Sequence, residues 1–150
     1  MRLYLDTEFS DLVPEAKLIS IAMVDENGDG FYAELTDTYM VEDCSDFTKE
    51  NVLPYLLGSQ YQMTRIECSL KLGAWIEDHN CHCVLSTDAP SWDMPFVMDL
   101  FADLWPNNLE KKHVFLTRYT ADEFEEKRKE LNLNQHNALH DALIMRALSK

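Results

Sequence analysis

The sequence predicts one α/β domain, built on a mixed five-stranded sheet with helices on both faces. Apolar segments at residues 3–9, 17–24 and 31–35 have the pattern of strands, and the Asn27-Gly28 turn signal between the last two predicts a hairpin. Helical and strand-like segments then alternate, which is typical of parallel strands joined by crossover helices. With 150 residues, 46 % of them hydrophobic, the whole chain (residues 1–150) fits a single domain with one core.

The later elements are predicted from apolar period and capping residues. Beyond the first three strands we expect helices at 48–57, 64–78, from Ser91 onward, 121–131 and 138–148, and strands at 81–86 and 114–116. In the helix at 64–78 the apolar stripe is expected to contain Ile66, Leu70, Ala74 and Trp75. A hairpin followed by crossovers predicts one antiparallel strand among parallel ones, and therefore a mixed sheet.

The four cysteines show no paired CxxC spacing. The segment His79-Asn80-Cys81-His82-Cys83 suggests a zinc site, but Cys81 and Cys83 alternate in an expected strand and would share one face. We interpret the cysteines as structural or surface thiols of a reduced, cytoplasmic protein. The longest apolar run, residues 18–24, is too short to cross a membrane, and the N-terminus has no secretory signal.

The net charge of −14 is unusual for a protein that binds nucleic acid, because phosphate-binding surfaces are usually basic. The acids concentrate in residues 1–50, whereas residues 101–150 hold as many bases as acids. Most of the acids are expected on the solvated surface. Such a chain would bind long duplexes poorly, but its charge is compatible with a short single-stranded end held at a metal-loaded site.

Three segments carry candidate chemistry, and the first is the end of the first strand. Asp6 and Glu8 are two residues apart, so both carboxylates lie on one face of the strand while Thr7 faces away. Two acids on a buried strand are costly unless a cation neutralises them. An edge strand with one solvated face is the alternative explanation.

The second segment is the start of the helix near Ser91. Asp93 lies in the expected first turn of this helix, directly after an apolar strand. The helix dipole alone favours an acid at such a position. Asp88, at the end of the strand, competes with Asp93 for any catalytic role.

The third segment is residues 136–142, near the C-terminus. Asp141 shares a helical face with Ala138, and an acid inside an apolar stripe indicates a functional site. His136 lies five residues before Asp141, just ahead of the helix, from where it can reach the same cleft. His140 points to a different face, so we interpret it as structural or surface-exposed, with the role of His136 as its alternative.

Together the three segments supply four carboxylates and a histidine, the groups that a two-metal phosphoryl-transfer site requires. Two Mg²⁺ ions, or Mn²⁺ as a substitute, about 3.5–4 Å apart activate the attacking water and stabilise the leaving oxygen. Hard divalent ions take oxygen ligands, which favours carboxylates over cysteines. The histidine would serve as general base, because its pKa near the working pH suits removal of a proton from water.

At these positions the chain resembles the DEDD exonucleases of the h subgroup. Their pattern is D-x-E on the first strand, an Asp opening a later helix, and H-x-x-x-x-D near the C-terminus. In this sequence the pattern reads Asp6, Glu8, Asp93, His136 and Asp141. The resemblance covers the whole chain and implies an RNase H-like fold. The small size and the Asp-Thr-Glu-Phe start look most like the compact bacterial RNase AS-like exoribonucleases, with RNase T and oligoribonuclease as more distant likenesses.

The resemblance implies a homodimer that removes nucleoside 5′-monophosphates from single-stranded RNA or DNA 3′ ends, RNA being the expected substrate. It implies two Mg²⁺ ions held by Asp6, Glu8, Asp93 and Asp141, with His136 as the base. Phe9, Leu12 and Trp92 would contact terminal bases by wedging or stacking, with core packing as the alternative for Phe9. Trp92-Asp93 departs from the more usual Phe-Asp of the second motif, which leaves Asp88 as an alternative ligand.

Two other classes of function stay open from the sequence alone. A non-catalytic module that binds nucleic acid or protein on the same fold would suit the heavy acidity, although the complete set of five site residues favours an enzyme. The second class is an RNase H-like nuclease that cuts nucleic acid internally. Titration with divalent metal separates the enzyme from the binding module, and a circular substrate separates internal cutting from attack at a free 3′ end.

Overall fold

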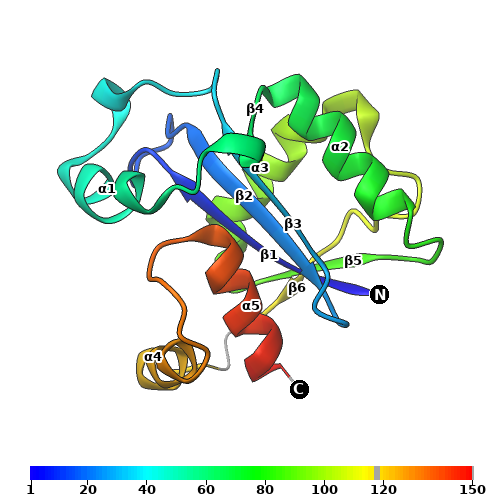
Figure 1. Ribbon diagram of the computed structural model, residues 1–150. Helices are drawn as coiled ribbons and strands as arrows, with labels where there is room; N and C mark the ends of the chain where they lie inside the picture. Colours follow the sequence, from blue (N-terminus) through cyan, green and yellow to red (C-terminus); the bar gives the residue numbers. More distant parts are fainter. Residues whose placement is uncertain (117–118, 150) are drawn as a thin grey trace.

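The expected α/β class is confirmed by the structure, a computed structural model that describes residues 1–116 and 119–149 (Figure 1). The strands are β1 (Arg2–Phe9), β2 (Leu18–Asp25), β3 (Gly30–Leu35), β4 (Gln62–Met63), β5 (Val84–Thr87) and β6 (Val114–Phe115). The α-helices are α1 (Asp46–Asn51), α2 (Arg65–Glu77), α3 (Pro90–Phe101), α4 (Ala121–Glu130) and α5 (Ala138–Leu148). Four 3₁₀ turns lie at Val41–Asp43, Leu53–Tyr55, Ser59–Tyr61 and Ala102–Leu104.

The sheet is mixed, with the order β4-β3-β2-β1-β5-β6. β2 runs antiparallel to both β1 and β3, whereas the pairs β1–β5, β3–β4 and β5–β6 are parallel. The prediction of one antiparallel strand among parallel ones is therefore confirmed. The number of strands was wrong: the sheet has six, because β4 adds two residues beside β3, and a segment that short leaves no recognisable period in the sequence.

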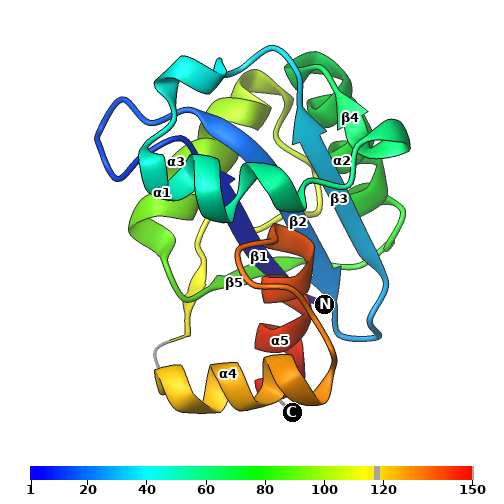
Figure 2. The ribbon, with the colours of Figure 1, turned by 60° about the vertical axis from the view of Figure 1, so that its left-hand side comes forward.

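Helices cover both faces of the sheet, as expected (Figures 1 and 2). On one face α5 packs on β1 and β2; on the other, α2 and α3 cover a core that contains Leu3 and Leu5 of β1. Side chains alternate along β1, so Tyr4 and Asp6 face α5. The central strand β2 is buried along its whole length, which requires cover on both sides.

Helix α2 buries a different face from the one that its apolar spacing predicts. Its buried residues are Cys68, Ser69, Leu72 and Ile76. Ile66 and Leu70, expected in the apolar stripe, are 68 % and 58 % exposed. Apolar residues occur on both sides of this helix, so the period alone does not identify the side that packs on the sheet.

Two helix boundaries also differ from the prediction, and both involve proline. Helix α3 begins at Pro90 with Ala89 as its N-cap, so Ser91, expected as the N-cap, lies inside the first turn. Proline is favoured at the first helical position, because its missing N–H is not needed there. The helix expected at 48–57 ends at Asn51, and Pro54 lies in the 3₁₀ turn that follows.

The strand expected at 81–86 begins at Val84, and this changes the placement of the neighbouring cysteines. Cys83 is buried and Cys81 exposed, so the two do not share one face. All four cysteines are free thiols, and within residues 1–116 and 119–149 none belongs to a group that could hold a metal ion. In the same part of the chain, no helix is both long and apolar enough to span a bilayer.

Candidate functional site

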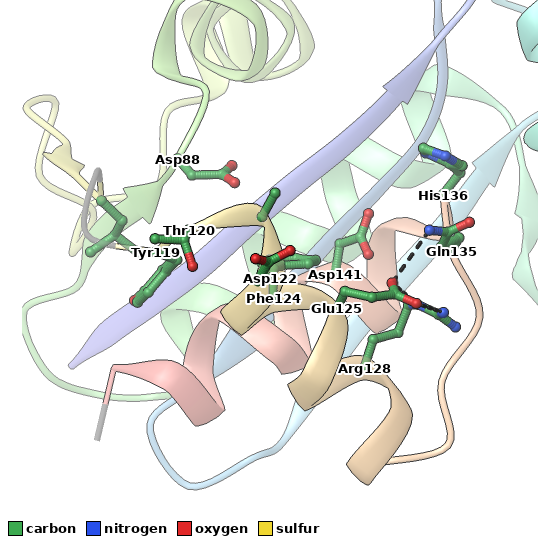
Figure 3. Close-up of a pocket in the computed structure, with 12 residues that line it drawn as sticks. Asp88, Tyr119, Thr120, Asp122, Phe124, Glu125, Arg128, Gln135, His136 and Asp141 are labelled. Carbon is green, nitrogen blue, oxygen red and sulfur yellow. Dashed lines mark hydrogen bonds and ion pairs between the residues drawn. The ribbon is translucent and has the colours of Figure 1, made fainter.

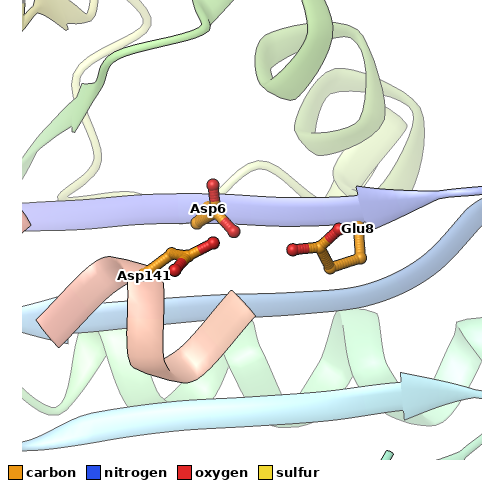
Figure 4. Close-up of side chains that lie close together, drawn as sticks. All are labelled: Asp6, Glu8 and Asp141. Carbon is orange, nitrogen blue, oxygen red and sulfur yellow. The ribbon is translucent and has the colours of Figure 1, made fainter. Parts of the chain in front are cut away.

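Five carboxylates converge near the carboxyl end of β1. Ligand oxygens of Asp6, Glu8 and Asp141 lie within 4.8 Å of one another, with Asp6 and Glu8 extending from β1 and Asp141 from α5 (Figure 4). Oxygens of Asp6, Asp88 and Asp93 form a second group within the same limit. Asp6 belongs to both groups and therefore lies at the centre of the site.

The close packing of α5 on the sheet brings Asp141 to Asp6. Asp6 pairs with Ala22 of β2, and the helix residues next to the sheet include Ala138 and Ala142; all three alanines are fully buried. Side chains this small allow the helix to approach the strands closely. Asp141 lies in the first turn of α5, one turn after the N-cap Asn137, and so faces the end of β1 that carries the acids.

Asp93 reaches the site from the opposite face of the sheet. Thr7, which alternates with Asp6 and Glu8, faces α3 and donates a hydrogen bond of 2.6 Å to Asp93 Oδ1, while Thr87 donates to Asp93 Oδ2. The pairing of β1 with β5 ends at Tyr4, so a carboxylate in the first turn of α3 can approach Asp6 past the end of β5. Asp93 is buried and Asp88 exposed, and the structure places both near Asp6.

The acids strongly perturb one another. Burial raises the pKa of Asp6 well above its usual range, and the charges of the other four acids raise it further. Burial and the neighbouring acids raise the pKa of Glu8 to about 8 and that of Asp141 to about 7. Burial also raises the pKa of Asp93, to about 6, against the opposing effect of the two threonine hydrogen bonds. Gathering these acids as anions therefore costs free energy unless a cation is present.

One atom in particular tests whether a metal ion fits this site. Asp6 Oδ2 is buried and has no hydrogen-bond partner among the residues that the structure describes. None of the five acids forms an ion pair with a basic residue in that same part of the chain. A buried carboxylate oxygen without a donor, surrounded by further carboxylates, is the ligand set that hard divalent cations take. The residues fit such an ion.

His136 lies at the edge of the acidic cluster, directly before α5. Its backbone has a φ of +53°, and its ring packs edge-on against Phe47 of α1 with 5.0 Å between ring centroids. Burial and the nearby Arg128 lower the pKa of His136, which favours the neutral ring near pH 7. His140 is placed differently, because its Nδ1 accepts a hydrogen bond of 3.0 Å from the Asn134 amide. That contact agrees with the structural interpretation of His140.

A cavity of about 640 Å³ lies between α4 and the acidic cluster. Figure 3 shows Asp88, Asp141 and His136 along one side of this cavity and side chains of α4 along the other. Arg128 is the basic residue in its wall, and its guanidinium is held by Glu125 and by the carbonyl oxygen of Leu133. Among the lining residues that the structure describes, the cavity is therefore acidic close to Asp141 and has one guanidinium, that of Arg128, farther away.

The residues expected to contact substrate lie in two places. Phe9 and Leu12 line a second cavity, of about 280 Å³, next to Glu8, and Leu12 is 71 % exposed. Trp92 lines a different cavity and stacks on the Phe9 ring, with 5.2 Å between centroids. Phe47 completes the wall beside Glu8 and was missed, because one phenylalanine in a short charged helix gives no local signal.

No protein-family model matches the chain, and no curated protein matches it. Membership of the DEDD exonucleases therefore stays a prediction that rests on the sequence pattern. The proximity of Asp6, Glu8, Asp93 and Asp141 is an independent observation, because nothing in a linear pattern requires these segments to meet in space. Functional inference for this chain rests on that geometry and its chemistry.

Proposed function

We propose that the protein is a metal-dependent 3′–5′ exonuclease that releases nucleoside 5′-monophosphates from single-stranded ends. The observation that carries the proposal is the convergence of acids around Asp6, whose buried oxygen has no partner within the described part of the chain. An acidic site of this kind repels a phosphodiester unless metal ions mediate the contact. Phosphodiester hydrolysis with two metal ions uses such a carboxylate set.

Four acids would hold the two Mg²⁺ ions: Asp6, Glu8, Asp93 and Asp141. When bound, the ions lower the pKa of a water molecule and stabilise charge on the leaving oxygen, and Mn²⁺ can supply the same chemistry. Thr7 and Thr87 orient the Asp93 carboxylate through their hydroxyl groups. Asp88 is exposed at the mouth of the site, where it contacts solvent as well as the other acids.

His136 is the proposed general base. Its lowered pKa keeps a ring nitrogen free to accept the proton of the attacking water near pH 7. It lines the same cavity as Asp141, so the proton can leave toward solvent. The edge-on contact with Phe47 restricts the orientation of the ring.

The cavity that Phe9, Leu12 and Phe47 line beside Glu8 suits the base of the terminal nucleotide, because its walls are mostly apolar and Glu8, one of the acids, is part of its lining. The net charge of −14 leaves little attraction for a long polyanion, which favours short single-stranded ends over duplexes. RNA as the preferred substrate follows from the resemblance and stays a prediction. The homodimer and the cytoplasmic location also stay predictions. Sedimentation of the purified chain tests whether it forms a dimer.

The proposal is tested with matched RNA and DNA oligonucleotides labelled at the 5′ end, incubated with the protein in Mg²⁺. We expect a ladder that shortens one nucleotide at a time, no reaction in EDTA, and resistance of circular and 3′-phosphorylated substrates. Cutting of the circular substrate would show internal cleavage in place of exonuclease action. If every linear substrate survives in both Mg²⁺ and Mn²⁺, the proposal is wrong.

The role of His136 is tested by His136→Ala, with His140→Ala as the matched control. General-base catalysis contributes about 10²- to 10⁴-fold, so the first variant should lose that much turnover while remaining folded. The control should keep most of its turnover, because its ring contacts the Asn134 amide. The reverse result would assign the role to His140.

A further inference from the structure

A fully buried glutamate, Glu34 on β3, plays no part in the chemistry described above. Its side chain accepts hydrogen bonds from the Tyr32 hydroxyl, from the Leu57 amide at 2.6 Å and from the Gly58 amide at 2.8 Å. Glu34 is 2 % exposed and forms no ion pair within residues 1–116 and 119–149. A carboxylate is expensive to bury, so three converging donors indicate a contact that the fold holds firmly.

The strand register places Tyr32 and Glu34 level with the metal-ligand candidates Asp6 and Glu8, two strands away in the sheet. Glu8 pairs with Ser20 and Ser20 with Glu34, while Asp6 pairs with Ala22 and Ala22 with Tyr32. Side chains of directly paired residues lie on the same face of a sheet. Tyr32 and Glu34 therefore occupy the same two rows and the same face as Asp6 and Glu8, two strands away. Helix α5 lies over β2, between the two pairs (Figures 1 and 2).

Asn137 connects the buried glutamate to α5. Its side-chain amide donates to the Tyr32 hydroxyl at 3.5 Å and to the Tyr55 carbonyl at 3.4 Å. Its Oδ1 accepts from the His140 amide at 3.2 Å, and so caps the helix. The side chain of Asn137 thus joins the start of α5 to β3, because it is hydrogen-bonded to Tyr32 of β3 and to the His140 amide of the helix.

A second connection runs through the loop after α1. Glu34 binds two successive amides of this loop, Leu57 and Gly58, and the same loop presents the Tyr55 carbonyl to Asn137. Gly58 has a φ of +69°, a conformation that other residues rarely adopt. Glu34 therefore reaches Asn137 both through Tyr32 and through the loop.

We propose that Glu34 and Tyr32 are positioning residues for the exonuclease reaction, and this rests on the function proposed above. They fix Asn137, and Asn137 fixes the residue before it, His136, and the first turn after it, which carries Asp141. His136 adopts a φ of +53°, which is unfavourable for a residue with a side chain and persists only where the surroundings hold it. Loss of the hydrogen bonds that join Glu34 and Tyr32 to Asn137 displaces His136 and Asp141, but leaves the cavity beside Glu8 unchanged.

The variant Tyr32→Phe removes only the hydroxyl that joins Glu34 to Asn137. We expect kcat to fall about tenfold or more, because small displacements of reacting groups have large effects on rate, while KM for the oligonucleotide stays within threefold. Tyr4→Phe is the matched control: Tyr4 is buried in the same cluster, and its hydroxyl has no hydrogen-bond partner among the described residues. It should keep both constants. A kcat for Tyr32→Phe within twofold of wild type, or a change confined to KM, would overturn the inference.

Amide hydrogen exchange provides a readout that does not require activity. In Tyr32→Phe the amides of His140 and Asp141, both bonded to Asn137, should exchange at least about tenfold faster, and in Tyr4→Phe they should not change. If the unmodified chain degrades no oligonucleotide, the proposed function fails, and exchange alone decides whether Tyr32 fixes α5. Unchanged exchange would overturn the inference whatever the activity.

Glu34→Gln extends the test to the other end of the network. One carboxylate oxygen becomes an NH₂ group that cannot accept a hydrogen bond, so at least one of the amides of Leu57 and Gly58 loses its acceptor while the side-chain volume is kept. A folded Glu34→Gln should show the same fall in kcat and the same faster exchange as Tyr32→Phe. A folded variant with wild-type kcat and exchange would remove Glu34 from the proposal.

Discussion

The paired strands β1 and β2 carry two aspartates, Asp25 at the end of β2 and Asp6 in the middle of β1, whose carboxylates have opposite kinds of neighbours. At the end of β2, Asp25 Oδ1 accepts from the amides of Asn27 and Asp29, at 2.8 and 2.9 Å, and Oδ2 lies 3.1 Å from His79 Nε2. In the middle of β1, Asp6 Oδ2 has no such partner in the described part of the chain and is surrounded by other acids. The first arrangement stabilises a turn, whereas the second costs stability and suits a cation.

Under the proposed function, this difference distinguishes an acid that serves folding, Asp25, from one that serves catalysis, Asp6. Both are aspartates on strands of one sheet, Asp25 buried and Asp6 partly buried, and residue type alone does not separate them. The two differ in what surrounds the carboxylate. Asp25 is hydrogen-bonded to amides of its own turn and to His79, whereas the carboxylate of Asp6 lies among further carboxylates. Proteins place such unfavourable groupings at functional sites.

The largest expected effect comes from Asp6→Asn, which removes the acid common to both groups. Turnover should fall about 10³-fold or more, because loss of metal binding removes several kcal/mol of transition-state stabilisation. In EDTA the same variant should unfold at a higher temperature than wild type, since one of the mutually repelling charges is gone. Activity assays and thermal unfolding check both parts. A destabilised Asp6→Asn would show that Asp6, like Asp25, serves the fold.

The opposite pattern is expected for Asp25→Ala. This change leaves His79 and two turn amides without their acceptor, and leaving a buried hydrogen-bonding group unsatisfied costs about 1–3 kcal/mol. Urea unfolding should show that loss, while turnover per folded molecule stays within twofold of wild type. A loss of less than about 1 kcal/mol would mean that the buried pair contributes little net stability.

In metal-free protein, stability should depend on pH through the acidic cluster. The pKa values of Glu8, Asp93 and Asp141 are raised to about 8, 6 and 7, so between pH 4 and 8 the folded state binds more protons than the unfolded state. The free energy of unfolding therefore falls as pH rises through that window. Mg²⁺ at a fixed concentration of 100 times its Kd at pH 8 should restore about 2.7 kcal/mol at that pH, and less at pH 5, where protons compete for the carboxylates.

Urea titrations at pH 5 and pH 8, with Mg²⁺ or EDTA, measure this dependence. Asp6→Asn is the control, because removing the central charge should flatten the pH profile. Stability that rises from pH 5 to pH 8 in EDTA would contradict the assignment of raised pKa values to these acids.

The smallest expected effect is that of Thr7→Val, which keeps the shape of the side chain and removes the donor to Asp93 Oδ1. One hydrogen bond to a buried acid contributes about 1 kcal/mol, so kcat/KM should fall about fivefold. Thr7→Ser keeps the hydroxyl and should recover most of the loss. Equal losses in both variants would mean that the methyl group of Thr7, and not its hydroxyl, positions Asp93.

The spacing of apolar and polar residues correctly predicted those helices and strands whose structure depends mainly on residues close in sequence. Helix α5 has the predicted bounds, and β1 carries Asp6 and Glu8 on one face as its period requires. The meeting of Asp141 with Asp6 was expected from a resemblance and is present in the structure. The choice between Asp88 and Asp93 was left open, and both lie near Asp6, because the end of β5 and the start of α3 are adjacent.

What the sequence did not reveal depends on contacts between distant segments. The buried face of α2 is decided by packing, since Leu70 and Leu72 are equally apolar and only Leu72 meets the core. The Tyr32–Glu34 pair looks like an ordinary alternating strand, and its role emerges only when Asn137, more than 100 residues later, comes to lie beside it. No local rule detects such a contact.

The three buried alanines between α5 and the sheet have a consequence for metal preference. Ala22, Ala138 and Ala142 set how far the helix stands from β1, and hence the gap between Asp141 and Asp6. Divalent ions differ in radius and in their tolerance of irregular coordination. If the proposed metal ions bind, ionic selectivity would then depend on side-chain volume at these three positions, none of which supplies a proposed ligand, and could be adjusted there by methyl-sized steps.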